Sequence, residues 1–353
     1  MRPQVRPLIR LKAVGQKKQI MFKTFKFFKI FFIVLVLFFF FIFLFSQGQI
    51  YKKEELEYGI TFSKKQAADL GLDWKNVYIS IFNDLGVKKI RLPAYWDEIE
   101  NQEGNYLWEN LDWQINQASE KQAEIILAVG ARLPRWPECH FPDWTEGRLK
   151  AQIENSTLIY LNKVIERYKD NKNIVAWQIE NEPFLSHFGD CPKFDAKFLD
   201  QEIALARSLD SRPIIVTDSG ELSYWVGAAK RADIFGTSMY LSTYSGFLKS
   251  YIHYPITPAF FKFKKNMASL FAKPKNWVVI EMQAEPWGPK AYQELSQADR
   301  DRTMNLKKFK EMIEFGHQTG FREFYLWGVE WWYWELKQGR PEVFNYAKTL
   351  FNK

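Results

Sequence analysis

The segment Ile174-Val-Ala-Trp-Gln-Ile-Glu-Asn-Glu-Pro183 changes character abruptly along its length. Its first six residues are mostly branched, apolar or aromatic, and they predict a buried β-strand over residues 174–179. The strand ends in the polar triplet Glu180-Asn181-Glu182, and Pro183 follows directly. Parallel α/β folds carry their chemistry at the carboxyl ends of strands, so the triplet lies where a functional site is expected. The alternative is a strand that runs into a solvated polar turn.

The chain after residue 57 repeats this order of a strand followed by a helix. Predicted strands cover residues 58–62, 87–92, 124–130, 174–179, 213–218, 233–240, 277–281 and 321–328. Predicted helices cover residues 73–85, 111–122, 146–169, 195–208, 222–229, part of 258–271, 298–315 and 341–351. Eight such units indicate one (β/α)8 TIM barrel over residues 58–353. A doubly wound open sheet is the alternative, but it predicts a glycine-rich turn after the first strand, and residues 61–65 contain no glycine.

The positive charge of the chain belongs to its N-terminal end. The formal net charge is +8, yet residues 1–50 hold nine basic residues and no acidic one. The remaining 40 basic and 41 acidic residues leave a net charge of −1. The folded part of the chain therefore lacks the basic surface that nucleic-acid binding requires, and no nucleic-acid partner is predicted.

An apolar run explains the basic N-terminus. Residues 30–45 are uninterrupted apolar residues, and positive charge precedes them. This pattern predicts a transmembrane signal anchor over residues 30–45, after a cytoplasmic segment over residues 1–29 and before a short tether over residues 46–57. The barrel would then lie outside the cytoplasm, attached to the membrane. The alternatives are a cleaved signal peptide, which would release a secreted enzyme, and a true start at Met21, which leaves the topology unchanged.

Cysteine and histidine usage argues against a metal site. The two cysteines, Cys139 and Cys191, and the four scattered histidines have no metal-type spacing, so neither a metal nor another cofactor is predicted. The cysteines fall in the loops after the third and fourth strands, which are neighbours in a barrel. A disulfide between them is predicted for an exported domain.

A barrel brings the carboxyl ends of its strands together, so residues at these positions become neighbours. They are Arg91, Asn181, Glu182, Tyr240, Glu281 and Trp327. Glu182 and Glu281 would face each other across the barrel mouth, as glycoside hydrolysis requires. Arg91 is expected to keep Glu281 ionised as the nucleophile, while Glu182 acts as acid and then as base. Asn181 is placed to bind the 2-hydroxyl of the sugar.

Other readings of these residues stay open. Arg91 is alternatively a buried ion-pair partner, and Tyr240 and Trp327 are alternatively packing residues at the barrel rim. Glu285 is a second candidate nucleophile, although it follows the seventh strand by four residues and Glu281 is preferred. The role of Glu180 is left open.

The loops after the predicted strands are rich in tryptophan. They contain Trp96, Trp136, Trp144, Trp225, Trp287, Trp331, Trp332 and Trp334. Exposed tryptophan faces suit stacking on sugar rings, and Trp136 and Trp287 are predicted to bind substrate in this way. The alternative for each of these side chains is packing beneath a long loop.

These residues carry a resemblance to glycoside hydrolase clan A, the retaining (β/α)8 superfamily that includes family 5 and family 42 enzymes. Asn181-Glu182-Pro183 closes the fourth strand and Glu281 closes the seventh. The resemblance implies that Glu182 is the acid/base and Glu281 the nucleophile. It also implies substrate-binding roles for Arg91, Tyr240 and Trp327, at the ends of strands two, six and eight.

The predicted function is that of a retaining β-glycosidase that hydrolyses a β-linked oligo- or polysaccharide by double displacement, without a cofactor. Many family 5 enzymes have His-x-Tyr near strand six, whereas Ser238-Met239-Tyr240 stands here, so the resemblance is to the clan more than to that family. The alternatives are a cell-surface carbohydrate-binding barrel without catalysis, and a transglycosidase.

Overall fold

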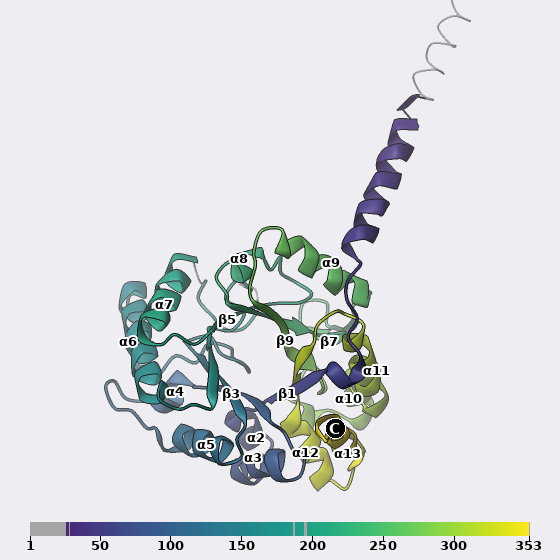
Figure 1. Cartoon of the computed structure of the whole chain (residues 1–353). Coiled ribbons are helices and arrows are strands. Elements are labelled where there is room, and N and C mark those ends of the chain that lie inside the picture. The colour runs from purple at the N-terminus through teal and green to yellow at the C-terminus, as the bar shows by residue number, and fades with distance from the viewer. Residues whose placement is uncertain (1–25, 28, 186–187, 194–195, 353) are drawn as a thin grey trace, which may run out of the picture. The chain divides into compact units, whose positions relative to one another are not determined.

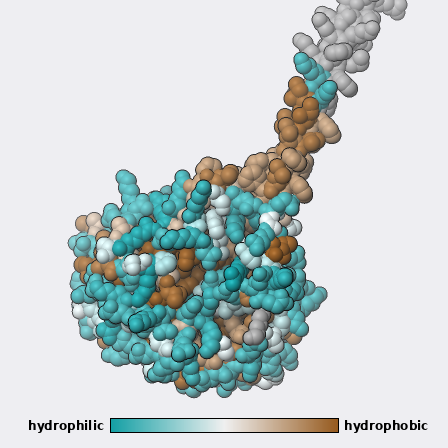
Figure 2. Space-filling model, viewed as in Figure 1, coloured by the Kyte–Doolittle hydropathy of each residue, from teal (hydrophilic) through white to brown (hydrophobic). Residues whose placement is uncertain are grey.

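The computed structural model describes residues 26–27, 29–185, 188–193 and 196–352. They belong to two compact units, one ending at Gly48 and the other beginning at Gln49. In the first unit residues 29–45 are helical, and their apolar side chains are largely exposed (Figure 2). None of the helices in these described ranges is long and apolar enough to cross a membrane. The spanning helix predicted over residues 30–45 is therefore not found among them, and most of the predicted cytoplasmic segment lies outside the described residues.

The second unit contains a closed barrel of parallel strands, which confirms the predicted (β/α)8 fold (Figure 1). The strands neighbour one another in the order β1-β10-β9-β6-β5-β4-β3-β2, and the circle closes between β2 and β1. Their bounds are β1 (Glu57–Thr61), β2 (Lys89–Pro93), β3 (Glu124–Val129), β4 (Ile174–Ile179), β5 (Ile214–Asp218), β6 (Ile234–Met239), β9 (Asn276–Gln283) and β10 (Glu323–Trp327). Each lies on or beside a strand expected from the sequence.

Helices surround the barrel (Figure 1). Those near the predicted ranges are α3 (Trp74–Asn83), α5 (Glu109–Glu120), α6 (Lys150–Tyr168), α7 (Ala196–Leu209), α8 (Val226–Ala229), α9 (Pro258–Ser269), α10 (Gln297–Thr303), α11 (Leu306–His317) and α13 (Glu342–Phe351). Asp73 caps α3 because its carboxylate accepts the N–H groups of Lys75 and Asn76. Residues 298–315 form two helices and not the single one predicted, because Asn305 is extended and caps α11 by accepting the N–H of Lys308.

Several short elements were not predicted. They are η1 (Lys53–Glu55), α2 (Lys64–Asp69), α4 (Trp96–Ile99), η2 (Asp143–Thr145), β7 (Ser242–Ser245), β8 (Ser250–His253), η3 (Tyr292–Glu294) and α12 (Val329–Lys337). The strands β7 and β8 form an antiparallel hairpin in the segment after β6. These elements are short, and short segments carry too little periodicity to be recognised from the sequence.

The two sides of each strand have different neighbours. One set of alternate residues packs against the helices, for example Ile125, Leu127 and Val129 on β3. The opposite set fills the barrel interior with a separate cluster: Ile126, Ala176, Ile215, Val278, Ile280 and Tyr325. This alternation follows from the two-residue repeat of a strand.

A β-bulge in β9 breaks this alternation next to the candidate site. Thr237 of β6 pairs with Val279, but the following Ser238 pairs with Glu281, so Ile280 is an extra residue. Val279 faces the helices and Ile280 faces the interior, so a regular strand would turn Glu281 toward the helices. The bulge instead lets Glu281 reach Arg91 inside the barrel.

The packing of Tyr325 generates a prediction about Gly59, the residue that pairs with it on β1. A Cβ atom at Gly59 would lie 2.7 Å from the Tyr325 ring and 2.9 Å from the carbonyl oxygen of Lys89. We expect Gly59→Ala to lower the free energy of unfolding by about 1–3 kcal/mol in urea denaturation, because the interior is overpacked. Gly246→Ala is the control, since no described atom beyond Gly246 and its two chain neighbours lies within 4 Å of its added Cβ. Equal stabilities of the two variants would contradict the prediction.

Candidate active site

A cavity of about 470 Å³ opens at the carboxyl ends of the strands, within the size range of sites that hold small ligands. Its lining includes six residues predicted from the sequence: Asn181, Glu182, Tyr240, Glu281, Trp287 and Trp327. The hairpin formed by β7 and β8 contributes a further wall, with Tyr244 and Phe247 among its lining residues. The barrel thus brings both predicted catalytic carboxyls into one cavity.

Glu281 is held by a buried arginine. The Arg91 guanidinium, which is fully buried, donates from Nη1 to Oε1 of Glu281 over 2.8 Å. Arg91 also donates from Nε to Gln178 over 2.7 Å. The hydroxyl of Tyr240 donates to the other carboxylate oxygen, Oε2, over 3.3 Å. The charge of Glu281 is therefore balanced by Arg91, and both of its oxygens are oriented.

Glu182 lies in a different environment. Burial raises the pKa of its carboxyl well above the usual range, and the negative charges of Glu281 and Glu138 raise it further. Its Oε1 atom is buried and has no hydrogen-bond partner among the described residues. Glu182 has a φ of 45°, a left-handed conformation that non-glycine residues adopt infrequently. Its N–H donates to Oγ1 of Thr217 over 2.8 Å, which helps to hold this backbone in place.

Asn181 joins the two sides of the site. Its Oδ1 accepts a 2.7 Å hydrogen bond from Nη2 of Arg91, and its Nδ2 donates to Oε2 of Glu138 over 3.2 Å. The orientation of the amide is therefore fixed before any substrate binds.

Glu180 points away from the cavity and has a structural role. Its carboxylate accepts the N–H groups of Ala131 over 2.7 Å and Arg132 over 2.5 Å, in the turn after β3. Gly130 lies so close that a Cβ atom there would be 2.3 Å from the Glu180 carboxylate. The two acids of the triplet 180–182 thus differ: Glu180 supports the backbone of the neighbouring turn, whereas Glu182 lines the cavity.

Glu285, the second candidate nucleophile, belongs to a buried network outside the cavity lining. Arg135 forms an ion pair with Glu285 through Nη1, and its Nη2 donates to Glu330 of α12 over 2.8 Å. Nε1 of Trp327 donates to the Glu285 carboxylate over 2.8 Å. These bonds occupy the Glu285 oxygens, which favours Glu281.

The loop tryptophans lie in different environments. Trp287 lines the cavity and packs edge-on against Tyr240, with ring centres 5.4 Å apart. Trp136 does not line the cavity; its side chain is 64% exposed and packs on Phe188. Four other loop tryptophans are fully buried beneath the loops, so sugar stacking is the wrong interpretation for them: Trp96, Trp225, Trp331 and Trp332.

Two further carboxyls in the cavity were missed by sequence reasoning. Glu138, in the loop after β3, is buried, and burial together with the charge of Glu281 raises its pKa to about 8. Glu221 follows β5, and burial raises its pKa to about 7. The disulfide between Cys139 and Cys191, with Cα atoms 5.3 Å apart, lies directly beside Glu138. In the sequence, the predicted disulfide was the one indication that Glu138, which precedes Cys139, is held near the site.

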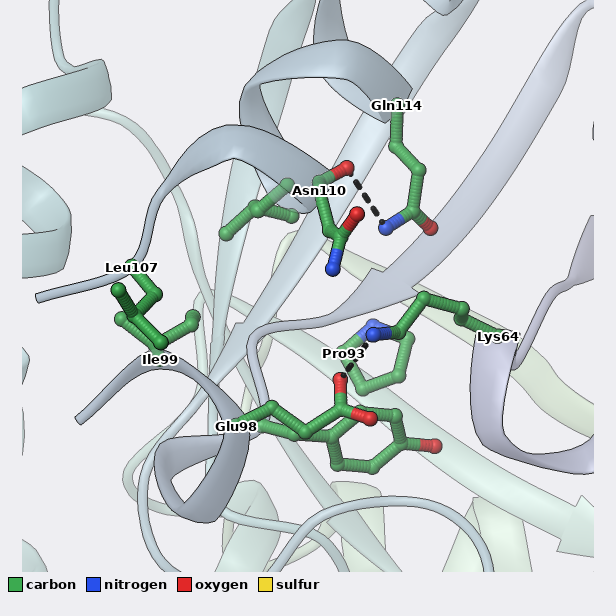
Figure 3. A pocket seen from close by; sticks show the side chains of 9 residues that line it. Lys64, Pro93, Glu98, Ile99, Leu107, Asn110 and Gln114 are labelled. Atoms are coloured by element: carbon green, nitrogen blue, oxygen red, sulfur yellow. Dashed lines mark hydrogen bonds and ion pairs between the residues drawn. The ribbon is translucent and has the colours of Figure 1, made fainter. Parts of the chain in front are cut away.

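A second hollow is much smaller than the main cavity. It lies between β2, α4 and α5, where Lys64 and Glu98 form a 3.0 Å ion pair (Figure 3). Its volume of about 20 Å³ suits a single water molecule and excludes a sugar. Within the described ranges, no group of three or more histidine, cysteine, aspartate or glutamate residues is arranged to hold a metal ion.

The ion pair between Arg91 and Glu281 generates a prediction of stability. We expect Arg91→Met to lower the free energy of unfolding by about 3–5 kcal/mol, because it leaves a buried carboxylate without its counter-ion. In the double variant Arg91→Met/Glu281→Gln that charge is absent, so the loss should be smaller than the sum of the two single losses. Urea denaturation of the four proteins measures this coupling. Additivity within about 0.5 kcal/mol would contradict it.

The Glu180 carboxyl faces Glu202 of α7, and this pair generates a prediction of pH dependence. Burial raises the pKa of Glu180 from its ordinary value of 4.5 to about 7, and burial also raises the pKa of Glu202. The folded state therefore binds protons more tightly than the unfolded state. The contribution of this pair to the free energy of unfolding is fully present below about pH 4.5 and is lost as the pH rises through about 7. We expect Glu202→Gln to remove part of this loss and to stabilise the protein by at least about 1 kcal/mol near pH 8.

Urea denaturation at about pH 5 and about pH 8 measures this difference. The control is Glu166→Gln, which changes an exposed glutamate of α6 that pairs with Lys169. A pH dependence that is the same in Glu202→Gln and in the unmodified protein would contradict the prediction.

Comparison with known proteins gives a partial match in sequence. Residues 73–201 match the Glyco_hydro_42 family model, described as beta-galactosidase. The chain is 25% identical over 189 residues to beta-galactosidase BgaA of Clostridium cellulovorans, which covers 47% of this chain and 29% of that protein. It is 30% identical over 122 residues to beta-galactosidase LacZ of Lactobacillus acidophilus, which covers 30% of this chain and 18% of that protein. The chain thus spans less than a third of the length of these curated relatives.

Solved structures share the barrel. An exo-beta-1,4-mannosidase from Opitutaceae bacterium strain TAV5 superposes with a TM-score of 0.56 at 12% identity, covering 84% of this chain and 59% of that chain. A beta-galactosidase from the psychrophilic Marinomonas ef1 superposes with a TM-score of 0.51 at 12% identity, covering 84% and 62%. At this identity the structures show a common fold. The family match across β2, β3 and β4, together with that fold, confirms that the chain resembles the (β/α)8 glycosidases of clan A, as its strand-end residues indicated.

Proposed function

We propose that this protein hydrolyses β-glycosidic bonds with retention of configuration. The observation that supports this most directly is the contrast between two carboxyls in one cavity. Glu281 is paired with Arg91, whereas Glu182 has a raised pKa and a buried oxygen without a partner among the described residues. A retaining glycosidase needs one carboxylate as nucleophile and one carboxylic acid as proton donor, and it sets them apart through their surroundings.

The first step forms a bond between enzyme and sugar. An oxygen of Glu281 attacks the anomeric carbon while the bond to the leaving oxygen breaks. Glu182 donates its proton to that oxygen, so the leaving sugar departs as a neutral alcohol and Glu182 becomes a carboxylate. Tyr240 and Arg91 hold Glu281 throughout, and Asn181 is placed to bind the 2-hydroxyl of the same sugar.

The second step releases the sugar. Glu182, now a carboxylate, accepts a proton from a water molecule, whose oxygen attacks the anomeric carbon and displaces Glu281. Both carboxyls return to their starting states. Two inversions give overall retention, and one water molecule is consumed for each glycosidic bond that is cleaved.

The names of the sequence relatives suggest the first substrates to test. Both are described as β-galactosidases, and the family model of that description matches residues 73–201, a range that includes Arg91, Asn181 and Glu182. We therefore propose β-galactosides as the first substrates. A role limited to binding carbohydrate gives no reason for an acid whose pKa is raised beside a carboxylate that an arginine balances.

We also propose that the barrel acts outside the cytoplasm. The disulfide between Cys139 and Cys191 supports this location, because disulfides persist in oxidising compartments. The basic residues before the apolar run at residues 30–45 support export as well.

Substitution of the two carboxyls tests the proposal. We expect Glu182→Ala and Glu281→Gly each to lower kcat/KM for an aryl β-galactoside by about 10²–10⁴-fold or more, since each removes a group that acts in the transition state. Azide should restore turnover of Glu281→Gly and yield an α-galactosyl azide, because the small anion attacks from the vacated side. Azide should not rescue Glu285→Gln, the matched substitution in the same segment. Turnover of Glu182→Ala or Glu281→Gly at the rate of the unmodified protein would refute the assignment.

A further inference from the structure

We propose that the cavity accepts a sugar unit with an amino group at C2, and that Glu138 is the residue that recognises this group. The inference rests on the proposed glycosidase function and adds to it a substrate class, the 2-amino-2-deoxy-β-glycosides. Three features carry it: the position of Glu138 beside Asn181, the sign of the charge that lines the cavity, and the rigidity of the loop that holds Glu138.

The position of Glu138 places its carboxyl near C2 of a bound sugar. Glu138 lines the same cavity as Glu182 and Glu281, and its residue is 6% exposed. Its Oε2 accepts the hydrogen bond from Nδ2 of Asn181 over 3.2 Å. Asn181 is the residue placed to bind the substituent at C2, so the Glu138 carboxylate adjoins that substituent.

The charge of the cavity favours a cationic group over a neutral or acidic one. Four acids line it, Glu138, Glu182, Glu221 and Glu281, and no lysine or arginine stands in the described lining. Arg91, which is not among the lining residues, forms the ion pair with Glu281. An ionised carboxylate in this largely buried space finds no lysine or arginine in the described lining to compensate it, and an uncompensated buried carboxylate is costly.

The pKa of Glu138 reflects this cost. Burial and the charge of Glu281 raise it to about 8, although the charges of Arg132 and Arg91 and the hydrogen bond from Asn181 oppose the rise. An ammonium group at C2 would supply the missing positive charge and form a charge-assisted hydrogen bond. A hydroxyl there can donate a hydrogen bond without balancing the charge, and a carboxylate would be repelled.

The loop holds Glu138 in a conformation that an unconstrained glutamate seldom adopts. Its φ is 73°, its N–H donates to the carbonyl of Arg135 over 2.7 Å, and its own carbonyl accepts the N–H of Leu133 over 2.7 Å. The next residue, Cys139, is bonded to Cys191. A Cβ atom at Gly189 would lie 2.6 Å from Cβ of Glu138, so the loop after β4 packs directly against it. Backbone strain of this kind is retained where a side chain must be held for a task.

The experiment compares matched substrates and matched variants. The substrates are aryl β-galactosides and β-glucosides that carry at C2 a hydroxyl, an amino or an N-acetylamino group. We expect the unmodified protein to favour the amino over the hydroxyl substrate of one series by about tenfold or more in kcat/KM. Glu138→Gln keeps the shape of the side chain and removes its charge, so it should reduce that ratio by about tenfold. Glu103→Gln, at an exposed acid paired with Arg148, is the control and should leave the ratio unchanged.

The N-acetylamino substrate keeps the test valid if Glu138→Gln folds poorly, because it removes the positive charge from the ligand instead. Its kcat/KM with the unmodified protein should fall below that of the amino substrate. A protein that hydrolyses hydroxyl substrates as well as amino ones, or a ratio that Glu138→Gln leaves unchanged, would overturn this inference and leave the glycosidase proposal intact. A protein that hydrolyses none of these substrates would overturn both.

Discussion

The guanidinium of Arg91 is the interaction on which the site depends. Fully buried within the barrel, it binds the carboxylate of Glu281, the amide of Asn181 and the side chain of Gln178 at once. A buried arginine is stabilised by oxygen partners in fixed directions, and its planar fork in turn fixes the partners. Residues from β2, β4 and β9 are thereby held in one geometry before a substrate arrives.

Irregular backbone conformations orient these side chains. The bulge at Ile280 turns Glu281 into the barrel, and left-handed conformations at Glu180 and Glu182 turn two acids of one triplet to different surroundings. Such departures cost free energy, and they persist because hydrogen bonds from neighbouring strands hold them. Thr217 of β5 and the turn after β3 supply those bonds.

The surroundings then give chemically identical carboxyls different properties. Glu281 is balanced by Arg91, Glu285 by Arg135, and Glu180 accepts backbone N–H groups. Glu182 and Glu138 lack an arginine partner among the described residues, and burial raises the pKa of both. A site that separates its acids in this way can hold one carboxyl as a nucleophile and another as a proton donor. Glu138 takes no part in the proposed hydrolytic steps and is therefore available to bind the group at C2 of the sugar.

The eight strands of the barrel and most of the helices between them could be predicted from the sequence alone, because hydrophobic patterns repeat along the chain and a closed parallel barrel packs such units together. It also located Glu182, Glu281 and Arg91, since carboxyl ends of barrel strands converge. Features that depend on contacts between distant segments could not be predicted in this way. The β7–β8 hairpin, the bulge at Ile280 and the entry of Glu138 into the cavity leave no periodic signal. The roles of the individual acids are likewise set by distant neighbours. Glu180 is bound by Arg132, 48 residues away, and Glu285 by Arg135, 150 residues away, and no local pattern in the sequence spans such separations.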